Sequence, residues 1–154
     1  MGQLMQGTVV WQEGMAFAAT PGSGHAITLD AAVEDGGQDK GSRPMELLLL
    51  GLGGCTGMDV ISILRKKRQD VTGYEVRVRG ERASDYPMVF THIVVEHVVR
   101  GRNLSPEAVR RAVELSATRY CSAAAMLGKV ARIEETYRVV QEAPDGKISA
   151  DSGD

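Results

Sequence analysis

Residues 44–68 read PMELLLLGLGGCTGMDVISILRKKR and predict one long helix. Ser42 suits the capping position before it, while Pro44 and Glu46 are favourable residues for a first helical turn. The basic residues 65–68 suit the negative end of the helix dipole. The chain is therefore organised around a helix that is apolar along most of its length.

This helix contains glycine at four interior positions, Gly51, Gly53, Gly54 and Gly57. Each costs about 1 kcal/mol relative to alanine, so the four together cost about 4 kcal/mol. That is a large part of the roughly 5–15 kcal/mol that holds a domain folded, and a compensating contact is expected. Glycines let a second helix approach at the near end of the usual range of about 8–10 Å between axes. Residues 116–125 are similarly rich in small side chains, so we expect the two segments to cross.

The two cysteines of the chain lie in these two segments, Cys55 in the first and Cys121 in the second. A crossing would bring the sulfurs within reach of each other, and a facing thiol pair is a redox device. Composition alone favours two inert core residues, because free cysteine is among the most buried residue types. A reactive thiol also needs a helix start, or a neighbouring cation such as Arg43, Arg119 or a histidine, to lower its ordinary pKa of about 8.5. Both interpretations stay open at this point.

The rest of the chain predicts an α+β fold. The predicted strands alternate apolar and polar residues or are rich in Val and Ile, and they span residues 6–12, 15–20, 25–32, 74–79, 90–99 and 134–140. A capped helix begins near Ser105, and helical spacing continues over residues 119–129. The order is βββ-α-ββ-αα-β, in a single domain over residues 1–141. The acidic, polar residues 142–154 are expected to form a disordered tail.

Length, composition and charge favour a soluble globular protein. With 154 residues, of which 43% are hydrophobic and 25% charged, the chain is long enough to bury a core. The formal net charge of −2 predicts no general attraction to nucleic acid or to an anionic membrane. No uninterrupted apolar run approaches the length that spans a bilayer, and no secretory signal is recognisable, so a cytoplasmic location is expected.

No metal or cofactor site is expected. His25, His92 and His97 are scattered without the spacing of metal ligands. His92 and His97 lie five residues apart in one predicted strand, so they point to opposite faces, and we interpret both as surface residues. The glycines of residues 51–54 are not followed by the Gly-Lys-Ser/Thr of a phosphate loop.

The helix start and the two cysteines resemble the OsmC/Ohr family. Its members carry Pro-x-x-Leu at the helix start, a cysteine eleven residues after the proline, and a second cysteine in a later helix. Here these are PMEL at residues 44–47, Cys55 and Cys121. The order of elements matches from about residue 6 to residue 140, so the resemblance covers nearly the whole chain.

The resemblance implies an OsmC-like fold, with antiparallel sheets wrapped around two central helices in an intertwined homodimer. It also implies thiol-dependent reduction of organic hydroperoxides in the response to oxidative stress. By position, Cys55 would attack the peroxide and become a sulfenic acid, and Cys121 would condense with it to a disulfide. A dithiol reductant, lipoyl-type in some members, would restore both thiols. Glu46 would be the candidate for the acidic side chain of the family's site.

Two departures from the family pattern leave other functions open. Peroxidase members have Glu immediately after the proline, where this chain has Met45, and one residue turns a helical side chain by about 100°. Those members also supply an Arg from the N-terminal glycine-rich turn, whereas residues 21–25 contain none and offer His25. The alternative is a non-enzymatic redox-sensing or small-ligand-binding dimer on the same fold. In a third interpretation the cysteines are core residues and the dimer has another task.

Overall fold

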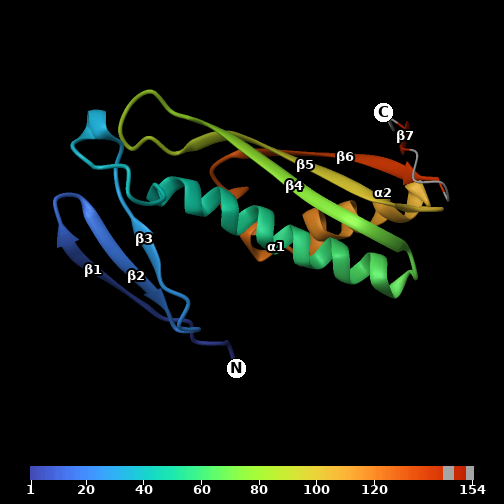
Figure 1. Ribbon diagram of the computed structural model, residues 1–154, viewed down its shortest axis with the longest axis horizontal. Helices are drawn as coiled ribbons and strands as arrows, with labels where there is room; N and C mark the ends of the chain where they lie inside the picture. The colour runs from blue at the N-terminus through green and yellow to red at the C-terminus, as the bar shows by residue number, and fades with distance from the viewer. Residues whose placement is uncertain (144–147, 152–154) are drawn as a thin grey trace. The chain divides into compact units, whose positions relative to one another are not determined.

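The β-rich first third of the chain forms a sheet of its own. The computed structural model describes residues 1–143 and, by their backbone, residues 148–151. The chain divides into two units after Leu48, and the predicted single domain over residues 1–141 stays a prediction. In the first unit the strands pair antiparallel (Figure 1), in the order β1 (Gly7–Glu13), β2 (Ala16–Pro21) and β3 (Ile27–Leu29).

A buried carboxylate holds the loop that follows β3. Asp30 accepts hydrogen bonds from the backbone N–H groups of Ala31, Gln38 and Lys40, at 2.8, 3.2 and 3.1 Å. The bond from Lys40 is the main cause of the lowered pKa of Asp30. The ionised carboxylate therefore fixes a polar loop that includes the short 3-10 helix η1 (Val33–Asp35).

The second unit is a layer of helices on a four-stranded sheet. The strands are ordered β4 (Asp70–Arg82), β5 (Phe90–Arg102), β6 (Arg132–Glu142) and β7 (Ile148–Asp151). The helical segments are α1 (Pro44–Lys66), α2 (Pro106–Leu115), the π-helical turn η2 (Ser116–Tyr120) and α3 (Ser122–Leu127). Figure 1 shows α1, which begins at the end of the first unit, running along this sheet.

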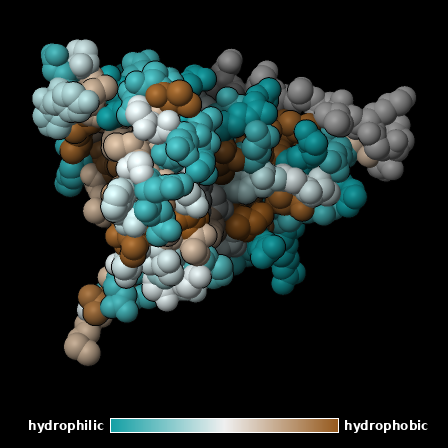
Figure 2. All heavy atoms as spheres, turned by 60° about the vertical axis from the view of Figure 1, so that its left-hand side comes forward, coloured by the Kyte–Doolittle hydropathy of each residue, from teal (hydrophilic) through white to brown (hydrophobic). Residues whose placement is uncertain are grey.

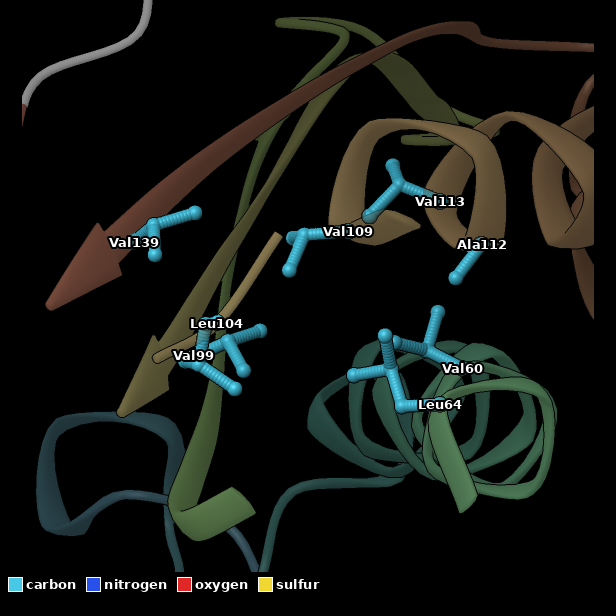
Figure 3. Close-up of a cluster of buried hydrophobic side chains, with 8 residues drawn as sticks. All are labelled: Val60, Leu64, Val99, Leu104, Val109, Ala112, Val113 and Val139. Atoms are coloured by element: carbon cyan, nitrogen blue, oxygen red, sulfur yellow. The ribbon is translucent and has the colours of Figure 1, made fainter. Parts of the chain in front are cut away.

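One cluster of buried aliphatic side chains joins the helices to the sheet (Figure 3). On α2, apolar residues three and four positions apart form one face, which packs toward α1, β5 and β6. Members of the cluster are Val60, Leu64, Val99, Leu104, Val109, Ala112, Val113 and Val139. This packing fixes the second half of α1 against α2, and so determines which residues of α1 face η2.

The α+β class and the order βββ-α-ββ-αα-β are confirmed, with β7 as an additional strand. The prediction that the sheets are antiparallel is wrong for one pair, because β5 and β6 run parallel. The connection between them passes through α2, η2 and α3. Such a helical crossover carries the chain from the end of β5 back to the end of the sheet at which β5 begins, so the next strand runs in the same direction.

The predicted disordered tail lies only partly within the described residues. Residues 148–151 form β7, which pairs antiparallel with the end of β6. For these residues the prediction of disorder is wrong, because the outer edge of β6 offers backbone groups with which even a polar segment can pair. Residues 144–147 and 152–154 lie outside the described part of the chain.

The glycines of α1 do not mark a helix crossing. A Cβ atom added at Gly53 would lie 2.9 Å from Val78 Cγ2 of β4, and one at Gly57 would lie 3.4 Å from another valine of that strand. A Cβ atom at Gly51 or Gly54 would meet no other described atom within 4 Å. The expected glycine-mediated crossing is therefore wrong. Two of the glycines instead allow α1 to lie close to β4.

Several apolar side chains of α1 and β1 are exposed. On α1 these are Leu48, Leu50 and Met58, and β1 is exposed along its whole length, Trp11 included. Figure 2 shows such hydrophobic side chains interspersed with hydrophilic ones. Among the described residues, α1 is the one helix that is long and apolar enough to cross a membrane, a test that core helices of soluble proteins also pass.

Candidate active site

The two thiols lie near the contact of α1 with the junction between η2 and α3. Cys55 is in the middle of α1 and is partly exposed, whereas Cys121 is 3% exposed. At Cys121 the π-helical turn ends and the backbone is extended. The Cys121 N–H donates to the Ser116 carbonyl at 2.8 Å, and its Sγ accepts from the Ala124 N–H at 3.4 Å. Cys121 is therefore fixed as the N-cap of α3.

Burial and negative neighbours set the protonation state of Cys121. Burial is the main cause that raises its pKa to about 11, and the adjacent Cys55 thiol and the Asp59 carboxylate act in the same direction. The hydrogen bond from the Ala124 N–H opposes them. Cys121 is therefore a protonated thiol at neutral pH. The structure brings the two free cysteines together, and their catalytic roles stay a prediction.

A buried chain of hydroxyl groups joins α1 to η2 beside the thiols. Thr56 Oγ1 and Ser116 Oγ lie 2.8 Å apart, and Ser116 Oγ donates to Asp59 Oδ2 at 2.9 Å. Because Ser116 has a single hydroxyl hydrogen, Thr56 is the donor to Ser116. Both hydroxyl residues are fully buried, and the chain ends on a carboxylate that lies one helical turn after Cys55. This contact holds the two cysteine-bearing segments in register.

Glu46 lies in the first turn of α1 and caps the start of that helix. Its Oε2 accepts a hydrogen bond from the Arg43 N–H at 2.9 Å, which satisfies a backbone donor at the N-terminus. Nine residues of helix correspond to about two and a half turns, so Glu46 and Cys55 project from opposite sides of α1. The catalytic role of Glu46 stays a prediction.

The cations considered as activators of a thiol have other partners. The Arg43 guanidinium pairs with Asp39 at 2.7 Å. The Arg119 guanidinium lies 5.4 Å from the centre of the Tyr120 ring. His25 Nδ1 lies 3.2 Å from the hydroxyl of Ser23, two residues before it. The charged group identified near the thiol pair is thus the Asp59 carboxylate, which is negative.

A buried polar network on the helix-covered face of the sheet was not predicted. Its members are Tyr74 of β4, His97 of β5 and Glu135 of β6. Tyr74 Oη lies 2.6 Å from His97 Nδ1, and His97 Nε2 lies 2.9 Å from Glu135 Oε2. Burial, followed by the charges of Glu135 and Asp59, raises the pKa of Tyr74, so its hydroxyl keeps its proton. Tyr74 packs against the buried aliphatic cluster that contains Val60 and Leu64 of α1, so this network lies on the side of the sheet that faces the helices.

His92 and His97 point to opposite faces of β5, as expected, but the prediction that both are surface residues is wrong. His92 Nε2 lies 2.8 Å from Glu134 Oε2 at the exposed face. His97 is fully buried, because it shares its side of the strand with apolar residues that face the helices, namely Ile93, Val95 and Val99. The same alternation places Glu135 between Ile133 and Tyr137. The burial of His97 and Glu135 could have been predicted from this two-residue alternation in the sequence.

A pocket of about 360 Å³ opens beside Asp59. Apolar groups from Ile63, Leu115 and Tyr120 line it, and Lys66 and Lys67 contribute its positive charge. An apolar wall next to polar groups is typical of sites for small organic ligands. The pocket thus lies one turn along α1 from the partly exposed thiol.

Comparison with known proteins identifies the class to which this fold belongs. The model of the family described as OsmC-like protein matches residues 37–136, a span that contains both cysteines. The chain belongs to the OsmC-like family. It is 46% identical to the protein YhfA of Escherichia coli over 136 residues, which are 88% of this chain and 98% of that relative.

Solved structures show the same fold. A hypothetical protein from Aquifex aeolicus is 30% identical with a TM-score of 0.81, over 92% of this chain and 100% of that one. The organic hydroperoxide resistance protein OhrB of Bacillus subtilis gives a TM-score of 0.61 at 17% identity, over 88% of this chain and 98% of that one. At so low an identity, the second likeness shows the fold alone.

Proposed function

We propose that the protein is a thiol-dependent peroxidase that reduces organic hydroperoxides through Cys55 and Cys121, with a role in the response to oxidative stress. The observation that carries the proposal is the pair of free thiols beside each other, one partly exposed and one buried. Peroxide from solvent reaches the exposed sulfur first. Membership of a fold family with structures named as organic hydroperoxide resistance proteins supports the same chemistry.

In the proposed reaction, the Cys55 thiolate attacks the peroxide oxygen that carries hydrogen. The O–O bond breaks, the alcohol leaves after taking up a proton, and Cys55 becomes a sulfenic acid. The Cys121 sulfur, after giving up its proton, attacks the sulfenic sulfur and releases water, which forms the disulfide. A dithiol of lipoyl type supplies the two electrons that return both cysteines to thiols.

The raised pKa of Cys121 supports the proposed roles within the pair. A thiol that stays protonated at neutral pH is a poor nucleophile toward peroxide. Cys121 therefore acts second, when the sulfenic acid has formed beside it. In the 360 Å³ pocket, Ile63, Leu115 and Tyr120 would contact the organic part of the substrate, and Asp59 would lie toward the reacting sulfur.

The working form is proposed to be a cytoplasmic homodimer. The exposed apolar side chains of α1 and the fully exposed strand β1 are the surfaces that a second copy would cover. Sedimentation equilibrium of the reduced protein should give twice the chain mass of 16.5 kDa. A single-chain mass at micromolar concentration would contradict the dimer.

Turnover tests the enzymatic proposal. The reduced protein, mixed with cumene hydroperoxide and an excess of dihydrolipoamide, should consume many equivalents of peroxide per chain. Cys55→Ser should abolish consumption. Cys121→Ser should consume about one equivalent rapidly and then continue slowly, because the dithiol must reduce the Cys55 sulfenic acid directly. Consumption that is equal in the wild type and Cys55→Ser would overturn the proposal.

The acidic surroundings of the thiols favour one second candidate, a redox sensor on the same fold. Burial, with smaller effects from Cys55 and Asp59, raises the pKa of Cys121, and Arg43 is paired with Asp39, so a fast catalytic cycle lacks an identified activating cation among the described residues. A sensor would be oxidised once and would not turn over when dithiol is supplied. The turnover assay above therefore distinguishes the two.

A further inference from the structure

Ser116 makes hydrogen bonds to both of the segments that carry the cysteines. Its backbone carbonyl accepts from the Cys121 N–H at 2.8 Å, five residues along the chain, and this bond closes the π-helical turn η2. Its hydroxyl lies 2.8 Å from Thr56 Oγ1 and donates to Asp59 Oδ2 at 2.9 Å. Thr56 follows Cys55 directly in α1, and Asp59 lies one turn after Cys55. One short residue thus connects the backbone at Cys121 to the part of α1 that carries Cys55.

The bonds of the Ser116 hydroxyl are directional, whereas the neighbouring contact between α1 and α2 is not. That contact consists of aliphatic side chains, among them Val60 and Val109. Burial of apolar surface is favourable in any close arrangement, so it holds the helices together without fixing one register exclusively. Hydrogen bonds between hydroxyl groups require short oxygen–oxygen distances and good alignment. The hydroxyl groups of Thr56 and Ser116 therefore specify how α1 meets η2.

The burial of these hydroxyl groups makes their pairing specific. Thr56 and Ser116 are both fully buried, so a hydroxyl that lost its partner through a shift of α1 would be left unsatisfied. Apolar side chains of the same shape would contribute similar stability to the fold. A satisfied, buried polar network differs from them in that it rigidifies one arrangement. The distinguishing property of this contact is therefore the position that it enforces.

We propose that Ser116 is a positioning residue for the Cys55–Cys121 disulfide. Its hydroxyl is bonded to α1 and its carbonyl to the backbone at Cys121, so both sulfurs are held where they can bond. The Ala124 N–H, 3.4 Å from Cys121 Sγ, orients the second sulfur in addition. A displacement of about 1 Å between reacting groups can cost about a hundredfold. The inference rests on the proposed function in one respect, namely that these two cysteines form a disulfide.

This positioning acts on the second step of the proposed reaction. Attack on the peroxide needs only Cys55, which is partly exposed. Formation of the disulfide needs the Cys121 sulfur to reach the sulfenic acid. Loss of the Ser116 hydroxyl should therefore leave the first step unchanged and slow the second. The sulfenic acid then has time to react with a second peroxide, which yields sulfinic acid.

Equilibration with dithiothreitol measures the positioning without any peroxide. The full-length protein is incubated in mixtures of reduced and oxidised dithiothreitol and blocked with N-ethylmaleimide, and the disulfide fraction is read from the intact mass. The Cys55–Cys121 bond forms as the bond of oxidised dithiothreitol breaks, and both thiol hydrogens pass to dithiothreitol. Ser116→Ala should lower the equilibrium constant at least about tenfold in protein that is folded by circular dichroism. A constant equal to that of the wild type would overturn the proposal.

Matched variants separate positioning from a general loss of stability. Thr56→Val keeps the shape of the side chain without its hydroxyl and should lower the equilibrium constant. Thr56→Ser keeps the hydroxyl and should stay closer to the wild type than Thr56→Val. Thr118→Val removes an exposed hydroxyl of the same turn, which donates to the Glu114 carbonyl at 2.8 Å, and should have no effect. Equal constants for the two Thr56 variants, or an effect of Thr118→Val as large as that of Ser116→Ala, would contradict the role of the hydroxyl groups.

The fate of this inference can be told apart from that of the peroxidase. A wild type that forms the disulfide with oxidised dithiothreitol but ignores cumene hydroperoxide would overturn the peroxidase, while the comparison of variants would still decide the role of Ser116. A wild type that forms the disulfide with both oxidants, with Ser116→Ala unchanged, would overturn only the positioning. Absence of a Cys55–Cys121 disulfide from the wild type in every mixture would overturn both.

Discussion

At the scale of single residues, burial is the main influence on the protonation of Cys121. Cys121 is buried beside Cys55 and Asp59, and each of these disfavours its thiolate. The positions of the cysteines in two small-residue segments could be read from the sequence. The raised pKa of Cys121 could not, because it results mainly from the burial of the thiol in the folded chain and, to a smaller extent, from the nearby Cys55 and Asp59.

Removing the Asp59 charge should make Cys121 more acidic. In a Cys55→Ser background, Asp59→Asn should lower the pKa of Cys121 below about 11, because a carboxylate that disfavours the thiolate is gone. The rate of alkylation by iodoacetamide as a function of pH measures this pKa. Asp70→Asn, at an exposed acid paired with Arg102, serves as the control and should leave the profile unchanged. An unchanged profile in Asp59→Asn would contradict the assigned cause.

The same raised pKa predicts a loss of stability at alkaline pH. The pKa of Cys121 is raised to about 11 in the folded state, which therefore holds the proton more tightly than the unfolded state. The resulting stabilisation is complete below about pH 9 and disappears as the pH passes about 11. Urea unfolding of the reduced protein should show a decline of about 1–2 kcal/mol across this window, after allowance for solvent screening. Cys121→Ser should remove that decline; if it persists in full, another group is responsible.

At the scale of elements, the long helix α1 (Pro44–Lys66) was predictable because its apolar content and charged ends are local properties. The direction of β6 was not, because strand pairing is decided by the crossover through α2 and α3. The burial of His97 and Glu135 could have been predicted from the sequence, since both follow the two-residue alternation of their strands. The role of the glycines was misassigned because the sequence does not say which element faces each side of a helix.

Two adjacent glycines of α1 should respond oppositely to alanine. Gly53→Ala places a Cβ atom 2.9 Å from Val78, so α1 or β4 must shift and the free energy of unfolding should fall. Gly54→Ala meets open space and should raise it by up to about 1 kcal/mol through helix propensity. Chemical denaturation of both variants provides the comparison. Destabilisation by Gly54→Ala would instead indicate that this side of α1 is covered by a second copy.

At the scale of the whole molecule, family membership and fold are established over most of the chain, while the assembly and the reaction are proposals. A short N-terminal sheet with an entirely exposed strand is a surface that a partner would stabilise. The sequence could suggest a dimer through the family resemblance. It could not show which surface forms it, because exposure depends on the folded chain.

Formation of a Cys55–Cys121 disulfide tests the central claim most directly. The reduced protein is treated with one equivalent of cumene hydroperoxide, blocked with N-ethylmaleimide, digested and analysed by mass spectrometry. We predict one linked peptide pair containing Cys55 and Cys121 within a single chain, with loss of both free thiols. Cys121→Ser should instead accumulate Cys55 sulfenic acid, trapped by dimedone. Two intact, maleimide-labelled cysteines after peroxide treatment would contradict the account.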